Sequence, residues 1–106
     1  MSEQPASMAN EIEITHHPLR NRFEAHVDGE LSRLEYRLQD GVMNIHHTEV
    51  PASLGGRGIG GKLVEAAVAY ARAHGLQVRA SCSYARHWME RHPASQDLSP
   101  PGVSRT

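Results

Sequence analysis

The chain has 106 residues, and its 11 Lys and Arg against 12 Asp and Glu give a formal net charge of -1 at pH 7. This length predicts one domain with a single core between a sheet and a pair of helices. The balanced charge disfavours nucleic-acid binding, and no apolar run is long enough to cross a bilayer. Cys82 is the single cysteine, so an intramolecular disulfide is excluded. With no signal-peptide pattern, we expect a cytoplasmic protein without membrane partners.

The first half of the chain alternates apolar and polar residues, which predicts four β-strands. After a predicted disordered leader at 1–10, the strands are expected at 11–16, 22–27, 31–39 and 42–50. Two Asp-Gly pairs between them are typical of two-residue hairpin turns, because both central residues take positive φ. Tight connections in a row predict an antiparallel meander with one apolar face. The side chains expected on that face are Ile12, Ile14, Phe23, Ala25, Val27, Leu34, Tyr36 and Leu38.

The second half predicts a helix at 59–74, with Gly75 in the left-handed position that ends it. A fifth strand follows at 76–81 and a short helix at 83–92. The predicted fold class is therefore α+β: a four-stranded antiparallel meander, a helix, a fifth strand and a C-terminal helix (ββββ-α-β-α). The domain is expected to span 11–95, with a flexible tail at 96–106. The buried stripe of the first helix is expected to hold Ile59, Leu63, Ala66, Ala67 and Tyr70.

Five glycines lie between Gly55 and Gly61, after the fourth strand and at the start of the first helix. The first turn of a helix has unpaired N–H donors, and the helix dipole adds roughly half a positive charge there. Arg57 and Lys62 add cationic side chains that suit a phosphate. We therefore predict phosphate or pyrophosphate binding. The alternatives are a flexible surface loop, and for Lys62 a solvated helix face.

Two phosphate-binding patterns match these letters but not their surroundings. Gly56, Gly61 and Lys62 fit the phosphate-loop pattern, yet Leu63 stands where a Ser or Thr hydroxyl must hold magnesium. The glycines also match a dinucleotide fingerprint, which belongs after the first strand of a parallel unit and here follows antiparallel strands. Both patterns fail on context.

A third pattern fits its surroundings. Val50-Pro51, the loop GGRGIGG and the following helix resemble the coenzyme A loop of the GNAT superfamily of N-acetyltransferases. HTEVP before the loop and SCSY after the fifth strand extend the resemblance over 11–95, to compact members of the superfamily. Two departures are visible: Gly55 stands where an Arg or Gln is usual, and the chain lacks the helical pair that helps to form the acceptor site.

The resemblance implies a GNAT-like N-acetyltransferase that uses acetyl-CoA as cosubstrate, releases coenzyme A and needs no metal. The acceptor would be an unidentified amine, and an open acceptor side suits a protein amine. The alternative is a module that binds coenzyme A or acetyl-CoA with weak or no catalysis. The residues that the resemblance assigns to the coenzyme are Val50, Pro51, Gly55, Gly56, Arg57, Gly58, Ile59, Gly60, Gly61 and Lys62.

The resemblance also implies catalytic roles near the end of the fourth strand. The Val50 N–H would stabilise the oxyanion, with Glu49 as first choice for general base and His47 as second. Strict alternation places His47 and Glu49 on the face of Met43 and Ile45, unless a bulge swaps the faces. The alternative is that these polar groups only close the sheet edge.

Two further candidates follow the fifth strand. Cys82 would lie near the coenzyme sulfur, either as an acetyl acceptor in a two-step route or as a small residue lining the pocket. Tyr84 would protonate the departing thiolate, or only pack. The histidines show no metal-ligand spacing; His87 and His92, for example, miss the same-face spacing of a helix.

Overall fold

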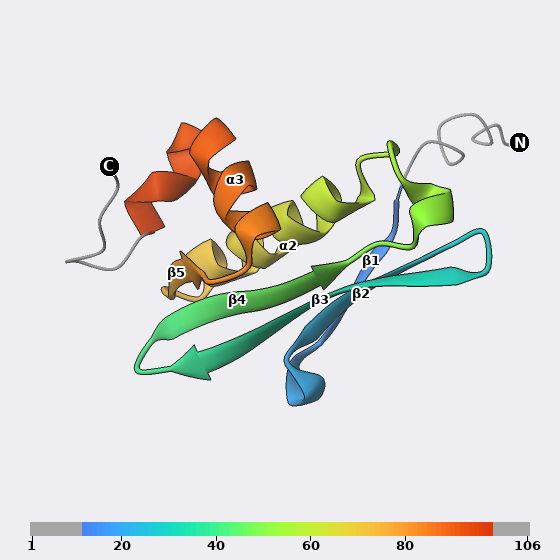
Figure 1. Ribbon diagram of the computed structural model, residues 1–106. Coiled ribbons are helices and arrows are strands. Elements are labelled where there is room, and N and C mark those ends of the chain that lie inside the picture. Colours follow the sequence, from blue (N-terminus) through green and yellow to red (C-terminus); the bar gives the residue numbers. More distant parts are fainter. Residues whose placement is uncertain (1–11, 99–106) are drawn as a thin grey trace, which may run out of the picture.

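The computed structural model describes residues 12–98 as a five-stranded sheet with α-helices against one face (Figure 1). The strand order is β1-β2-β3-β4-β5, with β1 to β4 antiparallel and β5 parallel to β4. The predicted α+β order is confirmed, while the predicted leader lies outside the described residues. The elements are β1 (Ile14–His17), η1 (Pro18–Arg20), β2 (Arg22–Val27), β3 (Glu30–Gln39), β4 (Val42–Glu49), η2 (Ala52–Leu54), α2 (Ile59–Ala73), β5 (Gln77–Ala80), α3 (Ser83–Arg91) and η3 (Pro93–Leu98), where η marks a 3-10 helix.

Both Asp-Gly pairs form the expected hairpin turns. Asp28 and Gly29 have φ of 52° and 76°, and Asp40 and Gly41 have φ of 53° and 78°. Two successive positive values define the turn whose twist matches that of the flanking strands. These turns set the registers that bring β2, β3 and β4 side by side.

The core lies between α2 and the sheet, and α2 is amphipathic as predicted. Its exposed face carries Lys62, Glu65 and Arg72. Leu38 is on the predicted face, since it pairs with the buried Met43, but its side chain is 47% exposed because it lies next to the hairpin turn at the end of the sheet. The buried side chains of α2 are Ile59, Leu63, Val64, Ala67, Val68 and Ala71; those of the sheet are Phe23, Ala25, Leu34, Tyr36, Met43, Ile45 and Val78. None of the described helices combines the length and apolar character that crossing a membrane requires.

A bulge interrupts the pairing of β3 with β4. Glu35 pairs with His47 while the next residue, Tyr36, pairs with Ile45, so His46 is the extra residue on β4. A bulge shifts every later side chain to the other face. Strict alternation is therefore wrong for the end of β4: His47 and Glu49 lie on the face opposite to Ile45.

β4 and β5 pair only over Val42–Ile45 and Gln77–Ala80. The N–H groups of Ser81 and Cys82 both donate to the Ile45 carbonyl, at 3.0 and 3.1 Å, and close the ladder. β4 continues to Glu49 without β5 beside it. The strands therefore part after Ile45, at the same point as the bulge.

The predicted tail begins too early. Residues 96–98 belong to η3, where Leu98 packs against the core and the Ser95 hydroxyl donates to the His92 carbonyl at 2.7 Å. Arg72 fixes this turn from α2 through two hydrogen bonds to Asp97, at 3.0 and 3.2 Å. Because the segment is polar, its sequence did not indicate these tertiary contacts.

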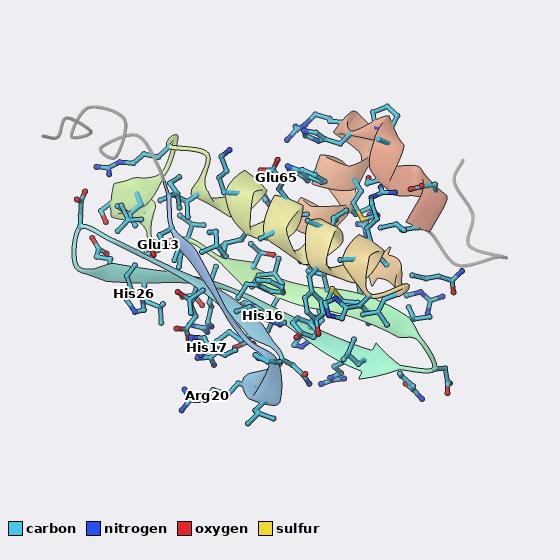
Figure 2. All side chains as sticks on the ribbon, turned by 180° about the vertical axis from the view of Figure 1, so that it is seen from behind. Glu13, His16, His17, Arg20, His26 and Glu65 are labelled. Atoms are coloured by element: carbon cyan, nitrogen blue, oxygen red, sulfur yellow. The ribbon has the colours of Figure 1, made fainter. Side chains whose placement is uncertain are left out.

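His16 on β1 lies within a cluster of aromatic rings (Figure 2). Its ring stacks on Phe23 at 4.0 Å between centroids, and its Nε2 is 2.6 Å from the Tyr36 hydroxyl. Burial, and then the neighbouring His17 and His74, lower the pKa of His16 below its ordinary value. The folded chain therefore resists protonation of this ring.

We predict that the protein loses stability when the pH falls below about 6.5. Because folding lowers the pKa of His16, the unfolded chain binds the proton at a higher pH than the folded chain does. The contribution of neutral His16 to the free energy of unfolding is therefore complete above its ordinary pKa. It is lost as the pH falls through the lowered pKa of the folded state. The pKa of Glu24 is also lowered, by a hydrogen bond from Arg22, but its contribution is lost only below 4.5. Chemical denaturation across pH measures this dependence. H16Q, which cannot titrate, should flatten the curve in the upper window; an unchanged curve in that variant would contradict the assignment.

Candidate functional site

The loop before α2 presents a run of free backbone donors. Gly56 and Gly58 take φ of +83° and +78°, conformations that favour glycine. The first helical hydrogen bond runs from the Lys62 N–H to the Gly58 carbonyl at 3.1 Å, and no side chain caps the helix. Within residues 12–98, the N–H groups from Gly56 to Gly61 have no acceptor. This segment suits an anion that accepts several N–H bonds at once.

The cationic side chains of the loop are held by carboxylates. Arg57 Nη1 lies 2.8 Å from Asp28 Oδ2 of the β2–β3 turn, and Lys62 Nζ lies 3.5 Å from Glu65 Oε1. All four side chains are about half exposed or more, at 50 to 61%. Exposed pairs contribute only about 0–1 kcal/mol, so either cation is free to exchange its carboxylate for a phosphate.

Gly60 and Gly61 allow α3 to approach α2. A Cβ on Gly60 would lie 2.8 Å from both Cζ and Oη of Tyr84, and one on Gly61 would lie 3.2 Å from Nε1 of Trp88. The glycines of this segment therefore have two roles. Gly56 and Gly58 shape the loop, whereas Gly60 and Gly61 make room for two aromatic rings.

The other predicted coenzyme residues connect the strand to this loop. Val50 packs against the core, and Pro51 immediately precedes η2, a turn that the sequence did not predict. Leu54 anchors that turn in the core, at 2% exposure. Gly55 is extended, and its N–H donates to the Ala52 carbonyl at 3.1 Å. Ile59 is buried and anchors the start of α2.

Cys82 lies where the two strands part. It is the residue just before α3, and its Sγ is 3.6 Å from the hydroxyl Oγ1 of Thr48 on β4. Burial is the largest single influence and raises the pKa of the thiol, but hydrogen bonds from the Ala85 backbone, the Thr48 side chain and the Tyr84 backbone outweigh it and lower the pKa overall. These hydrogen bonds therefore stabilise the thiolate by more than burial destabilises it. Thr48 was not among the predicted site residues, because the bulge that turns it toward the thiol has no signal in the sequence.

Glu49 and His47 lie together on the outer face of the sheet, the face without a described helix. Glu49 Oε1 forms an ion pair with Arg33 Nη2 at 2.9 Å and accepts a hydrogen bond from His47 Nε2 at 3.2 Å. These contacts orient the carboxylate. The pair continues as an ionic ladder through Arg33, Glu35, Arg22, Glu24 and His17.

Three of the four predicted catalytic residues thus fall into two groups, and the ring of the fourth, Tyr84, lies against Gly60 of α2. Glu49 and His47 contact each other on the outer face. Cys82 contacts Thr48, which pairs with the buried Leu34 and so faces the helices. β4 separates the two groups.

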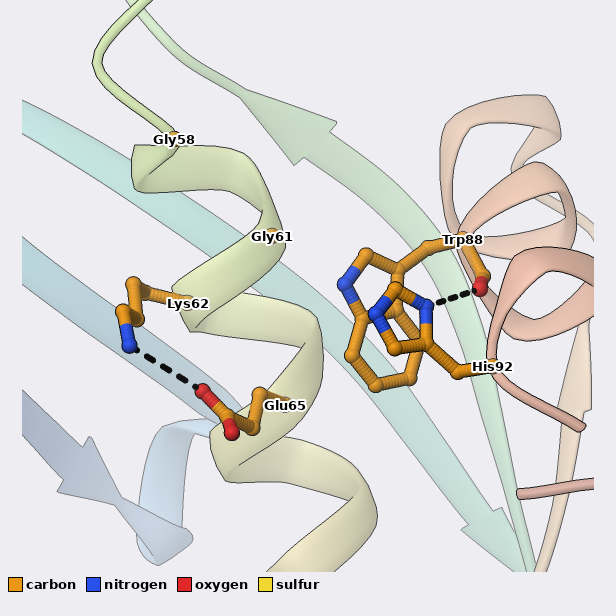
Figure 3. Close-up of a pocket in the computed structure, with 6 residues that line it drawn as sticks. All are labelled: Gly58, Gly61, Lys62, Glu65, Trp88 and His92. Atoms are coloured by element: carbon orange, nitrogen blue, oxygen red, sulfur yellow. Dashed lines mark hydrogen bonds and ion pairs between the residues drawn. The ribbon is translucent and has the colours of Figure 1, made fainter. Parts of the chain in front are cut away.

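A pocket of about 290 Å³ opens between the start of α2 and α3 (Figure 3). Trp88 and His92 of the α3 segment line it, and sequence reasoning did not assign either to a site. Tyr84, Trp88 and His92 are spaced four apart, which places them on one helix face. That spacing was the available signal. Among residues 12–98, no group of His, Cys, Asp and Glu is placed to hold a metal ion.

Comparison with protein families identifies the family of this chain. The family described as GCN5-related N-acetyl-transferase matches residues 22–98. The chain belongs to this family. The acetyltransferase match includes β2 to η3 and hence the glycine loop, the end of β4 and Cys82. The expected GNAT-like family and fold are confirmed.

A solved structure supports the same assignment. The chain is similar to the NMR solution structure of a GCN5-like protein from Staphylococcus aureus assigned as an N-acetyltransferase. The two share 36% sequence identity over 88% of this chain and 91% of the other, with a TM-score of 0.69. No curated protein matches the chain.

We predict that Gly60 and Tyr84 are energetically coupled. Alanine is intrinsically better than glycine within a helix by about 1 kcal/mol, so G60A would stabilise α2 if no neighbouring side chain opposed it. The clash with Tyr84 opposes that gain. Urea denaturation of G60A, Y84A and the double variant should give a coupling free energy of about 0.5–3 kcal/mol. Equal effects of G60A with and without the Tyr84 ring would contradict the packing described here.

Proposed function

We propose that this protein transfers an acetyl group from acetyl-CoA to an amine by direct attack of the amine on the thioester. The observation that carries the proposal is the run of unpaired N–H donors from Gly56 to Gly61, beside the parting of β4 and β5, in a member of an N-acetyltransferase family. A pyrophosphate is the anion that acetyl-CoA would bring to such donors. The parting strands leave the backbone of β4 free to meet the rest of the coenzyme.

In this proposal the loop binds the coenzyme in two steps. The pyrophosphate oxygens accept the free N–H groups, and Arg57 then exchanges Asp28 for a phosphate oxygen. Lys62 does the same at the cost of its weak contact with Glu65. The pantetheine arm follows the opening between β4 and β5, so the thioester lies near Val50 and Cys82.

The chemistry requires a neutral amine, an oxyanion donor and a proton for the leaving sulfur. Glu49, on the outer face, removes the amine proton directly or through a water molecule, with His47 holding the carboxylate. The nitrogen attacks the carbonyl carbon, and the Val50 N–H stabilises the oxyanion. The C–S bond then breaks, and the Tyr84 hydroxyl protonates the thiolate of coenzyme A.

The amine would arrive at the outer face. No described helix covers this face, so a bulky acceptor such as a protein amine can reach Glu49 without a displaced lid (Figure 1). Glu49 is itself half exposed, at 52%. We further propose that the protein works in the cytoplasm, where the free thiol of Cys82 stays reduced.

A two-step route is a second candidate, because hydrogen bonds lower the pKa of Cys82. In that route the Cys82 thiolate attacks the thioester, coenzyme A leaves as a thiolate that takes up a proton, and the acetyl group passes from Cys82 to the amine. Both routes use the same loop. They differ in whether the protein itself carries the acetyl group.

If transfer is direct, we predict that E49Q abolishes turnover without weakening the binding of acetyl-CoA. Removing a general base typically costs about 10²–10⁴-fold in rate. Calorimetry with acetyl-CoA should give an unchanged Kd, while transfer to a panel of amines and lysine peptides should fall at least 10²-fold. E90Q, an exposed glutamate on α3, is the control and should match the wild type in both. Binding without turnover on any amine would favour the coenzyme-binding module over an enzyme.

Intact mass spectrometry separates the two routes. Under direct transfer, incubation with acetyl-CoA should leave the protein mass unchanged. A gain of one acetyl group that is absent in C82A and retained in the control variant E90Q would establish Cys82 as the acceptor. An acetyl group retained in C82A would contradict the acceptor role of this thiol and indicate modification elsewhere.

A further inference from the structure

Trp88 and His92 form a stacked pair of rings at the edge of the pocket. Their centroids are 3.8 Å apart and their planes differ by 11°. His92 Nδ1 donates to the Trp88 carbonyl at 2.7 Å, which fixes the imidazole over the indole. Pro93 follows His92 and ends α3, so the pair stands at the end of the helix. Figure 3 shows the two rings overlapping beside the first turns of α2.

The stack lies next to the proposed phosphate site. Gly58 and Gly61 belong both to the donor run and to the pocket lining. Trp88 Nε1 comes within 3.2 Å of the position a Cβ would take on Gly61. A ligand anchored by a phosphate on these glycines therefore has the ring pair within reach of its next group.

The size of the pocket limits what it can hold. Its volume of about 290 Å³ is at the lower end of the roughly 300–1,000 Å³ of sites that hold whole small ligands. It suits one ring system rather than a complete coenzyme. Apart from the ring pair, its polar lining offers Lys62 and Glu65, a cation and an acceptor at the rim.

The direction along α3 decides which part of the coenzyme meets the pair. Cys82 lies at the start of α3, beside the parting strands, and His92 lies just past its end. At about 1.5 Å per residue, the ring pair is roughly 10–15 Å along the helix from the thioester end. In acetyl-CoA the pyrophosphate separates the thioester arm from the nucleoside. The group on the far side of the phosphates is therefore the purine ring.

We propose that the Trp88–His92 pair is a binding platform for the purine ring of the coenzyme, which extends the stack over the exposed imidazole. The inference rests on the function proposed above and adds a role for two residues outside the glycine loop. Purine rings stack on aromatic side chains through their π-faces, and a preformed stack loses little freedom on binding. The platform makes binding depend on the nucleoside and not only on the pyrophosphate and pantetheine.

Trp88 is the only tryptophan, so its fluorescence reports directly on the platform. We expect coenzyme A to quench this emission and 4′-phosphopantetheine, which lacks the nucleoside, to bind without comparable quenching. By calorimetry, H92A should raise the Kd of coenzyme A roughly tenfold, the scale of one base–aromatic stack. The same variant should leave the Kd of 4′-phosphopantetheine unchanged. H92F, which restores a ring, should recover most of the loss.

H87A is the matched control, because His87 is an exposed histidine of α3 outside the pocket. It should leave both affinities unchanged, and thermal melts should show that each variant is folded. If H92A weakens both ligands equally, or neither, the platform is wrong while the proposed function stands. If the wild-type protein binds neither ligand, the proposed function and the platform fall together.

Discussion

The extra residue that β4 carries at His46 decides which side chains meet at the end of this strand. Before it, Met43 and Ile45 point into the core; after it, Thr48 faces the helices while His47 and Glu49 face outward. The ladder between β4 and β5 ends at the same position. The strands therefore part at this one backbone irregularity. It also places Thr48, the partner of the Cys82 thiol, on one side of the sheet and the Glu49 carboxylate on the other.

The glycine segment depends on a second constraint, the close approach of α3 to α2. Backbone N–H groups without partners are unfavourable when buried. Gly56, Arg57 and Gly58 are exposed, so solvent or an anion can satisfy their N–H groups, whereas Ile59 and Gly60 are buried in the first turn of α2. Tyr84 and Trp88 fit against this helix start only because Gly60 and Gly61 carry no side chain. The same residues thus leave the donors open and bring aromatic rings beside them, an arrangement suited to a ligand with phosphates and a heterocycle.

Much of this fold could be read from local patterns. The Asp-Gly pairs at 28–29 and 40–41 and Gly75 each specify a conformation through neighbouring residues, and each was predicted. The apolar stripe of α2 was predicted in part: Ile59, Leu63 and Ala67 are buried as expected, Ala66 and Tyr70 are half-buried, and Val64, Val68 and Ala71 are buried as well. The family followed from the order of three motifs. The bulge at His46 could not be predicted, because an inserted residue changes the pairing without changing the alternation of residue types. The contact between Arg72 and Asp97 could not be predicted either, because it joins segments far apart in the sequence. The Trp88–His92 stack had a spacing signal, but nothing local connected it to the loop.

The central claim is that the amides of residues 56–61 bind the phosphates of acetyl-CoA. Chemical-shift mapping of the 15N-labelled protein during titration with acetyl-CoA tests it at each amide of a chain of 11.7 kDa. We expect the largest shifts from Gly56 to Gly61, with further shifts at Val50 and Cys82 and none in the turn at Asp40-Gly41. Absence of shifts at millimolar acetyl-CoA, or shifts that leave the glycine segment unchanged, would contradict it.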